Sequence, residues 1–355
     1  MWSQNTLTKR LKLKWPIFQA PMGSISTPAL AAEVSNAGGL GGLGMWGFAA
    51  VDAERRIAGF RQLSGGSLNV NYPLWPEPKI VPAAWEPMRK RLQAYYDEKG
   101  LGAIPEPLGA AGDVSPEHLE MLVRAKPEMV SFHFGVPDRK TVDAIKRAGI
   151  FVISSATTVA EAKILEDAGM DAIIAQGSEA GGHRGTFTAV DISMQPGLFA
   201  LLPQVVDAVR VPVIAAGGVA DGRTAAAAFV MGASAVQLGT AFLRCEEANL
   251  PEAYRAAIAE ANDACTLVTD MISGRPARFV RNRLTDELVG SGIKPLPFPL
   301  QLRVTMPLAG ARDRELTPLF SGQAAALARD TKAAELVKTL AEEITQRLRD
   351  FQTQH

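Results

Sequence analysis

The segment 176–185, QGSEAGGHRG, gathers four glycines around one of the four histidines of the chain. Glycine is costly to order, so such a cluster indicates backbone that bends sharply or approaches a ligand closely. Imidazole can exchange a proton near neutral pH and can also neutralise a bound anion. The combination predicts a ligand-facing loop with His183 as its catalytic residue. Glu179 and Arg184 flank His183, where each could either tune the imidazole or lie solvated.

A second histidine, His133, ends the candidate strand MVSFHFG. A lone strand histidine is more often a hydrogen-bonded structural residue, but two of four histidines on one catalytic face favour a functional pair. The chain has no H-x-H, H-E-x-x-H or cysteine pair, so we expect no metal site. Cys245 and Cys265 are predicted to be buried or incidental thiols.

Two glycine-containing turns follow the last two candidate strands. Gly217 and Gly218 lead into a helix that begins near Asp221, while Gly239 and Thr240 offer further backbone N–H groups and a hydroxyl. Free amides and the partial positive charge of a helix N-terminus favour a bound anion. This pattern predicts a phosphate-bearing ligand; the alternative is that the glycines only form tight turns.

Three amide side chains, Asn69, Gln176 and Gln237, are expected at strand ends. An amide cannot do acid–base chemistry, but it offers both donors and acceptors. Three converging amides suit a heterocycle that alternates carbonyls and ring nitrogens, such as an isoalloxazine.

The elements that must position these residues alternate along the chain. Apolar runs separated by helical patterns predict a parallel sheet, and eight such units over about 230 residues fit a (β/α)8 TIM barrel. In that fold the catalytic residues lie at the C-terminal ends of the strands. The candidate strands are 16–22, 39–44, 67–72, 129–135, 151–156, 172–177, 211–218 and 235–242.

The segment 39–44, GLGGLG, matches the dinucleotide-binding pattern G-x-G-x-x-G, which would favour an open doubly wound sheet instead. That fingerprint follows a strand, opens a helix and has an acidic residue about 20 positions later. Here a helix precedes the glycines, and 61–69 contains no Asp or Glu. We interpret the segment as a glycine-rich barrel strand.

Beyond Phe242 the alternation stops. A helix is expected over 251–264, followed by an irregular tract with prolines at 295, 297, 299 and 307 that exclude a central strand. Apolar residues at four-residue spacing predict a closing helix within 321–352. We therefore expect a barrel over 1–245, a smaller inserted domain over 246–320 between strand 8 and the closing helix, and a C-terminal helix in 321–355 that returns to the barrel.

Composition narrows the class of protein. The chain has 37 basic and 37 acidic residues and is 47% hydrophobic, which gives no nucleic-acid or membrane-surface signature. The basic N-terminus lacks the apolar run of a signal peptide, and no apolar segment approaches the roughly 20 residues that span a bilayer. We expect a cytoplasmic protein that is a monomer or a weak homo-oligomer.

Four long motifs resemble those of class I nitronate monooxygenases, formerly called 2-nitropropane dioxygenases. They are QAPMGSISTPALAAEVSNAGGLGGLG, SFHFG, AQGSEAGGHRG and AAGGVADGRTAAAAFVMGASAVQLGTAFL, with weaker support from SGRPARFVRN and SGQAA. The resemblance covers about 15–245. It implies a TIM barrel that binds FMN non-covalently, without a metal, and oxidises nitronates with O2 to a carbonyl compound and nitrite. The typical substrate is propionate 3-nitronate, a toxic natural product.

The resemblance also implies roles for particular residues. His183 would be catalytic, and His133 and Tyr254 would line the substrate pocket. Relatives carry tyrosines and a lysine in that pocket, whereas this chain offers apolar residues such as Phe298 with only Lys294 and Arg303 nearby. The flavin would be held by Ala20, Pro21, Met22, Gly23, Asn69, Gln176, Gly181, Gly182, Gly217, Gly218, Gln237, Leu238, Gly239 and Thr240.

Two other functions remain open. A flavin reductase on the same barrel would use NAD(P)H to reduce a quinone or an enoyl thioester. A flavin-free lyase or aldolase would bind a sugar phosphate, but it would need a Schiff-base lysine or paired carboxylates at strand ends, and the sequence shows neither.

Overall fold

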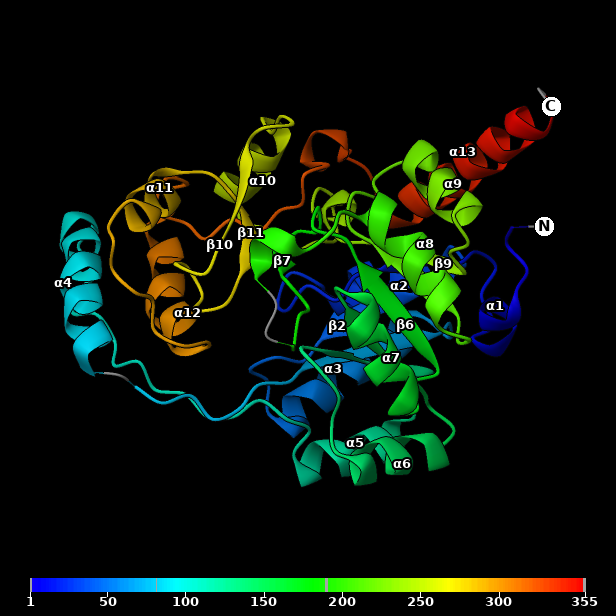
Figure 1. The fold of residues 1–355 in the computed structure, drawn as a ribbon, viewed down its shortest axis with the longest axis horizontal. Helices are drawn as coiled ribbons and strands as arrows, with labels where there is room; N and C mark the ends of the chain where they lie inside the picture. Colours follow the sequence, from blue (N-terminus) through cyan, green and yellow to red (C-terminus); the bar gives the residue numbers. More distant parts are fainter. Residues whose placement is uncertain (1, 81, 189–190, 354–355) are drawn as a thin grey trace.

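The computed structural model describes residues 2–80, 82–188 and 191–353. Eight parallel strands form one sheet in the order β1-β9-β8-β6-β5-β4-β3-β2, and a bridge between Phe18 and Leu40 joins its two edges (Figure 1). The predicted (β/α)8 barrel is therefore confirmed. Its strands are β1 Ile17–Gln19, β2 Gly41–Gly44, β3 Leu68–Pro73, β4 Met129–His133, β5 Phe151–Ala156, β6 Ala172–Gln176, β8 Val213–Ala216 and β9 Ala235–Leu238.

The glycine-rich segment is strand β2, as interpreted from the sequence. A Cβ on Gly41 would lie 2.1 Å from the carbonyl oxygen of Ala31, and one on Gly42 would lie 2.6 Å from that of Gln19. These glycines therefore allow the preceding helix and strand β1 to pack closely against β2.

Helices cover the outside of the barrel, and several begin with a side-chain cap. Thr27 accepts a hydrogen bond from the N–H of Leu30 at the start of α2, and Thr158 accepts one from Glu161 at the start of α7. The surrounding helices are α2 Pro28–Asn36, α3 Ala50–Leu63, α5 Pro116–Ala125, α6 Arg139–Arg147, α7 Val159–Asp167, α8 Leu198–Ala208, α9 Gly222–Val230 and the closing helix α13 Ala333–Thr353.

The N-terminal end of the barrel is closed by α1 Thr6–Arg10. Leu7 and Leu11 pack with the side chains inside the barrel, and Ser67 at the start of β3 donates to the carbonyl of Leu11. A ligand can therefore reach the barrel axis only from the opposite end, where the strands finish.

A smaller domain covers part of that opposite end. It contains α10 Glu252–Ala259, α11 Arg283–Val289, α12 Leu300–Thr305, and an antiparallel sheet of β10 Thr266–Thr269, β11 Ala277–Val280 and β7 Gly182–His183. Short 3-10 turns occur in both domains, at η1 Ile192–Met194, η2 Thr240–Phe242, η3 Met306–Ala311 and η4 Ala325–Leu327. The closing helix begins later than the expected segment 321–352, because 321–332 is largely irregular.

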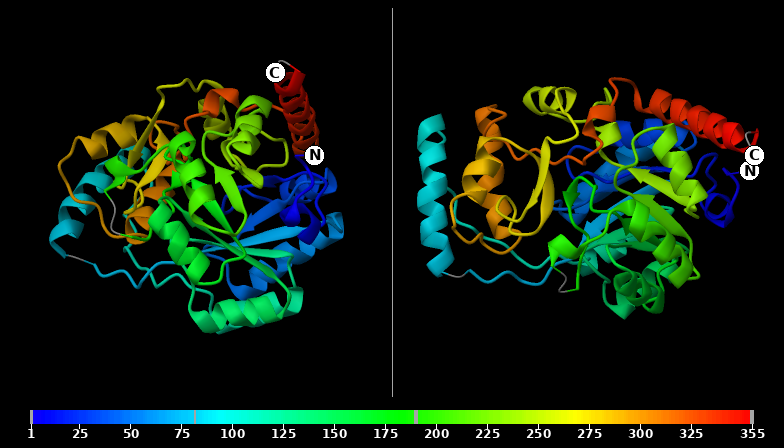
Figure 2. Two further views of the ribbon diagram at one scale, coloured as in Figure 1. Left: turned by 45° about the vertical axis from the view of Figure 1, so that its right-hand side comes forward. Right: turned by 45° about the horizontal axis from the view of Figure 1, so that its top comes forward.

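The small domain also includes α4 Pro82–Lys99, which lies within the range 1–245 expected for the barrel. Figures 1 and 2 show α4 beside α11 and α12, at the end of the molecule opposite α1 and α13. Trp85, Met88 and Leu92 of α4 share one buried cluster with Ile272 and Leu288. The small domain thus draws on three separate parts of the chain, which are α4, the short strand β7 and the segment after β9.

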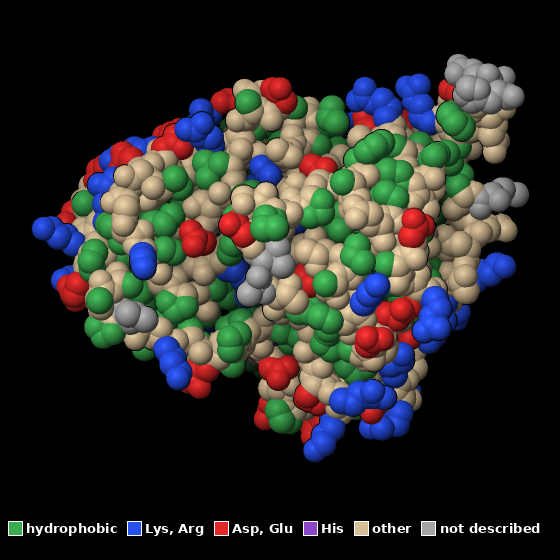
Figure 3. All heavy atoms as spheres, viewed as in Figure 1, with side chains coloured by type: hydrophobic (Ala, Val, Ile, Leu, Met, Phe, Trp, Pro, Cys, Tyr) green, Lys and Arg blue, Asp and Glu red, His purple; other side chains and the backbone are tan. Residues whose placement is uncertain are grey.

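On the face shown in Figure 3, acidic and basic side chains are interspersed over both domains. Within the described residues, no helix is both long enough and apolar enough to cross a bilayer. The two cysteines are free thiols, and Cys245 is buried.

Candidate active site

Alternation along the strands turns the predicted amides toward the barrel axis. Val70, Ala175 and Val236 belong to the outer core between strands and helices. Successive strand residues face opposite sides, so the neighbouring Asn69, Gln176 and Gln237 face inward. The three side chains from β3, β6 and β9 therefore share the interior of one barrel.

Two of these amides keep a free polar atom. Asn69 Oδ1 and Gln237 Oε1 are buried and have no hydrogen-bond partner among the described residues, and the same holds for His183 Nε2. A buried polar atom without a partner is costly, so such atoms call for an explanation, such as a polar ligand. Gln176 differs, because its Nε2 donates to the carbonyl of His183 at 3.1 Å and its Oε1 accepts from the N–H of Gly185 at 2.7 Å. Gln176 thus fixes the histidine loop.

The loop after β1, residues 20–23, lies against the end of β9. The N–H of Ala20 donates to the carbonyl of Leu238 at 2.8 Å, and a Cβ on Gly239 would lie 3.5 Å from Ala20 Cβ. Gln19 is buried, and the sequence did not single it out. Its Nε2 donates to Ser26 Oγ at 2.8 Å and its Oε1 accepts from the N–H of Gly42 at 2.8 Å, so Gln19 holds this loop in place. The predicted segments Ala20–Gly23 and Gln237–Thr240 therefore meet.

The predicted phosphate site keeps free backbone donors. Gly217 and Gly218 have φ values of +98° and +70°, a conformation that favours glycine. Within the described parts of the chain, the N–H groups of Gly218, Gly239 and Thr240 donate to no acceptor. We call these four residues, Gly217, Gly218, Gly239 and Thr240, the glycine cradle.

The N-terminus of helix α9 does not add to this cradle as the sequence suggested. Asp221 accepts hydrogen bonds from the N–H groups of Arg223 and Thr224, and Glu343 of α13 accepts from that of Gly222 at 2.9 Å. The protein's own carboxylates already satisfy the donors of this helix end. Anion binding at the glycine cradle therefore depends on its loop amides.

His183 lies in the short strand β7, opposite Ala277 of β11. Its ring packs among three phenylalanines, with centroid distances of 5.6 Å to Phe134, 5.1 Å to Phe298 and 5.4 Å to Phe320. The small domain contributes Phe298, and Phe320 lies where that domain returns to the barrel. The histidine thus sits at the seam between the two domains.

His133 lies next to this loop and is bonded through both ring nitrogens. Nδ1 is 3.1 Å from Ser155 Oγ, and Nε2 is 3.2 Å from the carbonyl oxygen of His183. Burial, followed by the charge of Arg275, lowers the pKa of His133 to about 4, although its bond to the His183 carbonyl acts in the opposite direction. Burial, followed by the charges of His133 and Arg275, lowers the pKa of His183 to about 3.

The two charged neighbours of His183 are structural and not solvated loop charges. Arg184 is 0% exposed and donates to the carbonyls of Gln176 and Gly177 and to Gln195 Oε1. Burial lowers the pKa of its guanidinium to about 10, which leaves it cationic at neutral pH. Glu179 accepts from the N–H of Leu198 at the start of α8. Both residues fix the loop that carries His183.

Tyr254 of α10 is 4% exposed, and its hydroxyl donates to the carbonyl of Phe320. The ring of Phe320 contacts His183, so Tyr254 reaches the histidine through one intermediate residue. Of the residues expected over the site, Phe298 contacts His183, whereas Arg303 is exposed.

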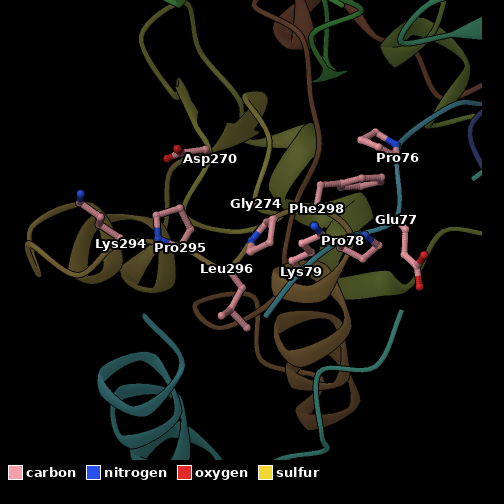
Figure 4. A pocket seen from close by; sticks show the side chains of 11 residues that line it. Pro76, Glu77, Pro78, Lys79, Asp270, Gly274, Lys294, Pro295, Leu296 and Phe298 are labelled. Carbon is pink, nitrogen blue, oxygen red and sulfur yellow. The ribbon is translucent and has the colours of Figure 1, made fainter. Parts of the chain in front are cut away.

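Phe298 is one of the residues that line a surface pocket of about 710 Å³. Figure 4 shows the side chains of Lys294, Lys79 and Asp270 around it, with Phe298 in its wall. Because Phe298 also contacts His183, its ring lies between this pocket and the histidine. No group of three His, Cys, Asp or Glu side chains suited to a metal ion occurs among the described residues.

One cation near the histidines was missed from the sequence. Arg275 lies 4.0 Å above the ring of Phe134, and its charge acts on both His133 and His183. The segment SGRPARFVRN marked this region only as part of a motif, and nothing local in it indicates that Arg275 is turned toward the barrel.

The chain is similar to proteins of one family over nearly its whole length. The sequence profile of the family described as nitronate monooxygenase matches residues 4–343. A nitronate monooxygenase of Pseudomonas aeruginosa is 41% identical over 349 residues, covering 95% of this chain and 98% of that protein. The structure of a nitroalkane oxidase from Streptomyces ansochromogenes has a TM-score of 0.90 at 37% identity, covering 98% of this chain and 100% of the other. FabK from Thermotoga maritima is more distant, with a TM-score of 0.78 at 28% identity and 99% of each chain covered.

Proposed function

The chain belongs to the nitronate monooxygenase family of flavin-dependent oxidoreductases, and we propose that it uses FMN and O2 to oxidise alkyl nitronates to carbonyl compounds and nitrite. Propionate 3-nitronate is the proposed typical substrate. The observation that best supports a flavin is the set of buried polar atoms without partners, Asn69 Oδ1 and Gln237 Oε1, inside a barrel that also bears His183.

The residues present fit FMN in particular. The glycine cradle offers free amides for one phosphate, and the G-x-G-x-x-G match at 39–44 forms strand β2 and not a dinucleotide-binding turn. Asn69 and Gln237 would bond the ring system, the loop Ala20–Gly23 and Gly181 with Gly182 would line it, and Gln176 would hold the histidine loop against it. When bound, FMN supplies the redox chemistry by accepting electrons from the nitronate.

The protein's own contribution is to bind the anion and orient it. A nitronate is already a carbanion equivalent, so it needs no proton abstraction before it is oxidised. With its low pKa, His183 is neutral at pH 7 in this site, where its free Nε2 can hydrogen bond to the substrate. His133 would line the same pocket and keep the His183 backbone in place.

The alternative of an NAD(P)H-dependent flavin reductase is not favoured. The likeness to FabK is weaker than the likeness to the nitroalkane oxidase on both identity and TM-score. A cytoplasmic location and a monomeric or weakly self-associating state belong to the same proposal as the substrate.

Oxygen uptake by the purified protein tests this proposal. We expect released flavin to be FMN, and we expect rapid oxygen consumption with propionate 3-nitronate and ethylnitronate but little with NADH. Nitrite should accumulate in step with the oxygen consumed. Fast NADH oxidation without nitronate turnover would instead support the reductase.

A further inference from the structure

Arg275 is a charged side chain in a largely buried position, and it forms no ion pair among the described residues. It precedes β11, and its guanidinium donates to the backbone carbonyl of Thr186. Nε is buried and has no partner, and no carboxylate of the described residues forms an ion pair with it. The charge of Glu161 acts on Arg275 from nearby, but the hydrogen bonds of this carboxylate come from Thr157, Thr186, Phe187 and Thr188 and not from the guanidinium. A desolvated cation in this state is stabilised by a bound anion.

The position of Arg275 brings its charge to the candidate site. The guanidinium carbon lies 4.0 Å from the ring centroid of Phe134, and that ring contacts His133 at 4.5 Å and His183 at 5.6 Å. The next residue, Pro276, accepts a hydrogen bond from the N–H of Arg184 at 2.8 Å. Arg275 is therefore tied to the same backbone that positions His183.

The histidines cannot supply a positive charge at neutral pH. Burial, followed by neighbouring charges that include Arg275, holds the pKa of His133 near 4 and that of His183 near 3. Burial also lowers the pKa of Arg275, but only to about 10, so its guanidinium stays protonated. An anionic substrate at this site thus needs a cation other than imidazolium.

We propose that Arg275 is a substrate-binding residue that supplies the positive charge for the nitronate group. This inference rests on the proposed function, since it names the residue that would recognise the anion. A guanidinium is a planar fork of donors, and it matches the planar O–N–O group of a nitronate better than an ammonium does. The cation–π contact with Phe134 and the hydrogen bond to the carbonyl of Thr186 hold the guanidinium beside the site.

Steady-state kinetics of Arg275→Met and Arg275→Lys test the assignment. Loss of a charged hydrogen bond should raise KM for ethylnitronate about 10-fold to 100-fold in Arg275→Met, with a smaller change in kcat and full FMN content. Arg275→Lys keeps the charge but loses the fork, so we expect an intermediate KM. Arg281→Met, which removes an exposed arginine of the same segment paired with Asp286, should behave as wild type.

Two further measurements separate the possible outcomes. Propionate 3-nitronate should show the same rise in KM as ethylnitronate. A rise for propionate 3-nitronate alone would mean that Arg275 binds the carboxylate and would overturn the nitronate assignment.

Nitrite, an unreactive O–N–O anion, should perturb the flavin absorbance and bind at least tenfold more weakly to Arg275→Met. This titration needs no turnover, so it still tests Arg275 if the wild-type protein fails to oxidise nitronates. An unchanged nitrite Kd in a folded, FMN-loaded Arg275→Met protein would refute the inference.

Discussion

At the scale of single residues, the surroundings of His183 decide what an imidazole can do there. The ring packs among phenylalanines, and a guanidinium charge lies nearby, so the protonated form is disfavoured. A neutral ring with a free Nε2 remains a good hydrogen-bonding group. In this arrangement the tasks are divided, with charge supplied by Arg275 and hydrogen bonding by His183.

The substitution His183→Asn tests the second task. Asparagine removes the imidazole Nε2, and its shorter side chain cannot place a donor or acceptor at the same point, so we expect FMN to be retained and kcat/KM for nitronates to fall about 10-fold to 100-fold, the scale of a lost hydrogen bond to a charged group. His133→Asn should cost less, because both nitrogens of His133 are engaged with Ser155 and the backbone. Oxygen uptake by both variants at matched flavin content measures the difference. Near-normal turnover by His183→Asn would remove it from the catalytic role.

The lowered pKa values of the two histidines predict acid sensitivity of the fold. An unfolded histidine has a pKa of about 6.5, whereas the folded values are about 4 for His133 and about 3 for His183. Between pH 6.5 and 4 the unfolded chain binds more protons, so the free energy of unfolding falls as the pH falls, by up to about 1.4 kcal/mol per pH unit for each histidine. Above about pH 6.5 this effect is absent.

Urea unfolding of the FMN-loaded protein from pH 8 to pH 5 measures this effect. His133→Asn should lose less stability over the range than wild type, because one of the two proton-linked groups is gone. Carboxylates contribute equally to both proteins, so the difference between the curves isolates the histidine. Parallel curves for the two proteins would contradict the predicted linkage.

The sequence indicated the role of a residue where that role depends on its neighbours along the chain. Glycines with a histidine between them marked the loop of His183, and the structure places that loop at the seam of the two domains. Arg184 and Arg275 could not be distinguished from surface arginines, because their burial depends on chain segments far away in the sequence. The role of such an arginine can be assigned only when the residues around it in the fold are known.

At the scale of elements, Gly218 in the turn after β8 and Gly239 in the turn after β9 differ in backbone conformation. Gly218 has φ +70°, so any side chain there is strained whatever is bound, and its Cβ would also lie 3.7 Å from the carboxyl carbon of Glu179. Gly239 has φ −107°, and its Cβ would make only ordinary contacts with Ala20 and Met22. Gly239 is therefore the better position for testing phosphate binding without straining the backbone.

We expect Gly239→Asp to weaken FMN binding. A carboxylate about 4 Å from a phosphate costs about 1–4 kcal/mol across the relevant range of dielectric constants, which corresponds to about a fivefold or greater rise in Kd. Gly239→Ala is the matched control and should bind FMN nearly as well as wild type. Flavin fluorescence titration of the apoproteins gives both Kd values, and equal Kd values for the two variants would exclude this part of the cradle from the phosphate site.

Element types were predictable because apolar strands and capped helices are local signals, and all eight expected barrel strands are present. The function of a helix end was less predictable. The sequence near Asp221 suggested a helix N-terminus open to a phosphate, yet Asp221 and Glu343 occupy it. An N-cap aspartate satisfies its own helix first, and the second carboxylate comes from a helix more than 100 residues later.

At the scale of the whole molecule, the small domain depends on packing between α4 and residues far away in the sequence, which no local pattern predicts. The apolar residues Trp85, Met88 and Leu92 have helical spacing, so a helix could be read from the sequence of α4. Their partners, such as Ile272 and Leu288, lie about 180 residues further along the chain. The sequence led us to expect a smaller domain after β9, but nothing in it indicated that the segment between β3 and β4 would pack there.

The seam between the two domains yields a last prediction, for Tyr254→Phe. The lost hydroxyl leaves the carbonyl of Phe320 without this donor, and Phe320 packs against His183. We expect the apparent KM for nitronates to change while FMN stays bound, because the ring that borders the histidine is no longer held.

The substitution Tyr96→Phe gives a matched control for this effect. Tyr96 is also buried, and its hydroxyl donates to the carbonyl of Val304 at 2.9 Å inside the small domain. Both variants remove one hydrogen bond from a tyrosine hydroxyl to a backbone carbonyl, which should cost about 0.5–1.5 kcal/mol of stability in each case. Only Tyr254→Phe should alter KM, because only Tyr254 bonds a residue in contact with His183. Equal KM shifts in both variants would instead indicate a general loosening of the small domain, and unchanged kinetics in Tyr254→Phe across several nitronates would remove Tyr254 from the substrate pocket.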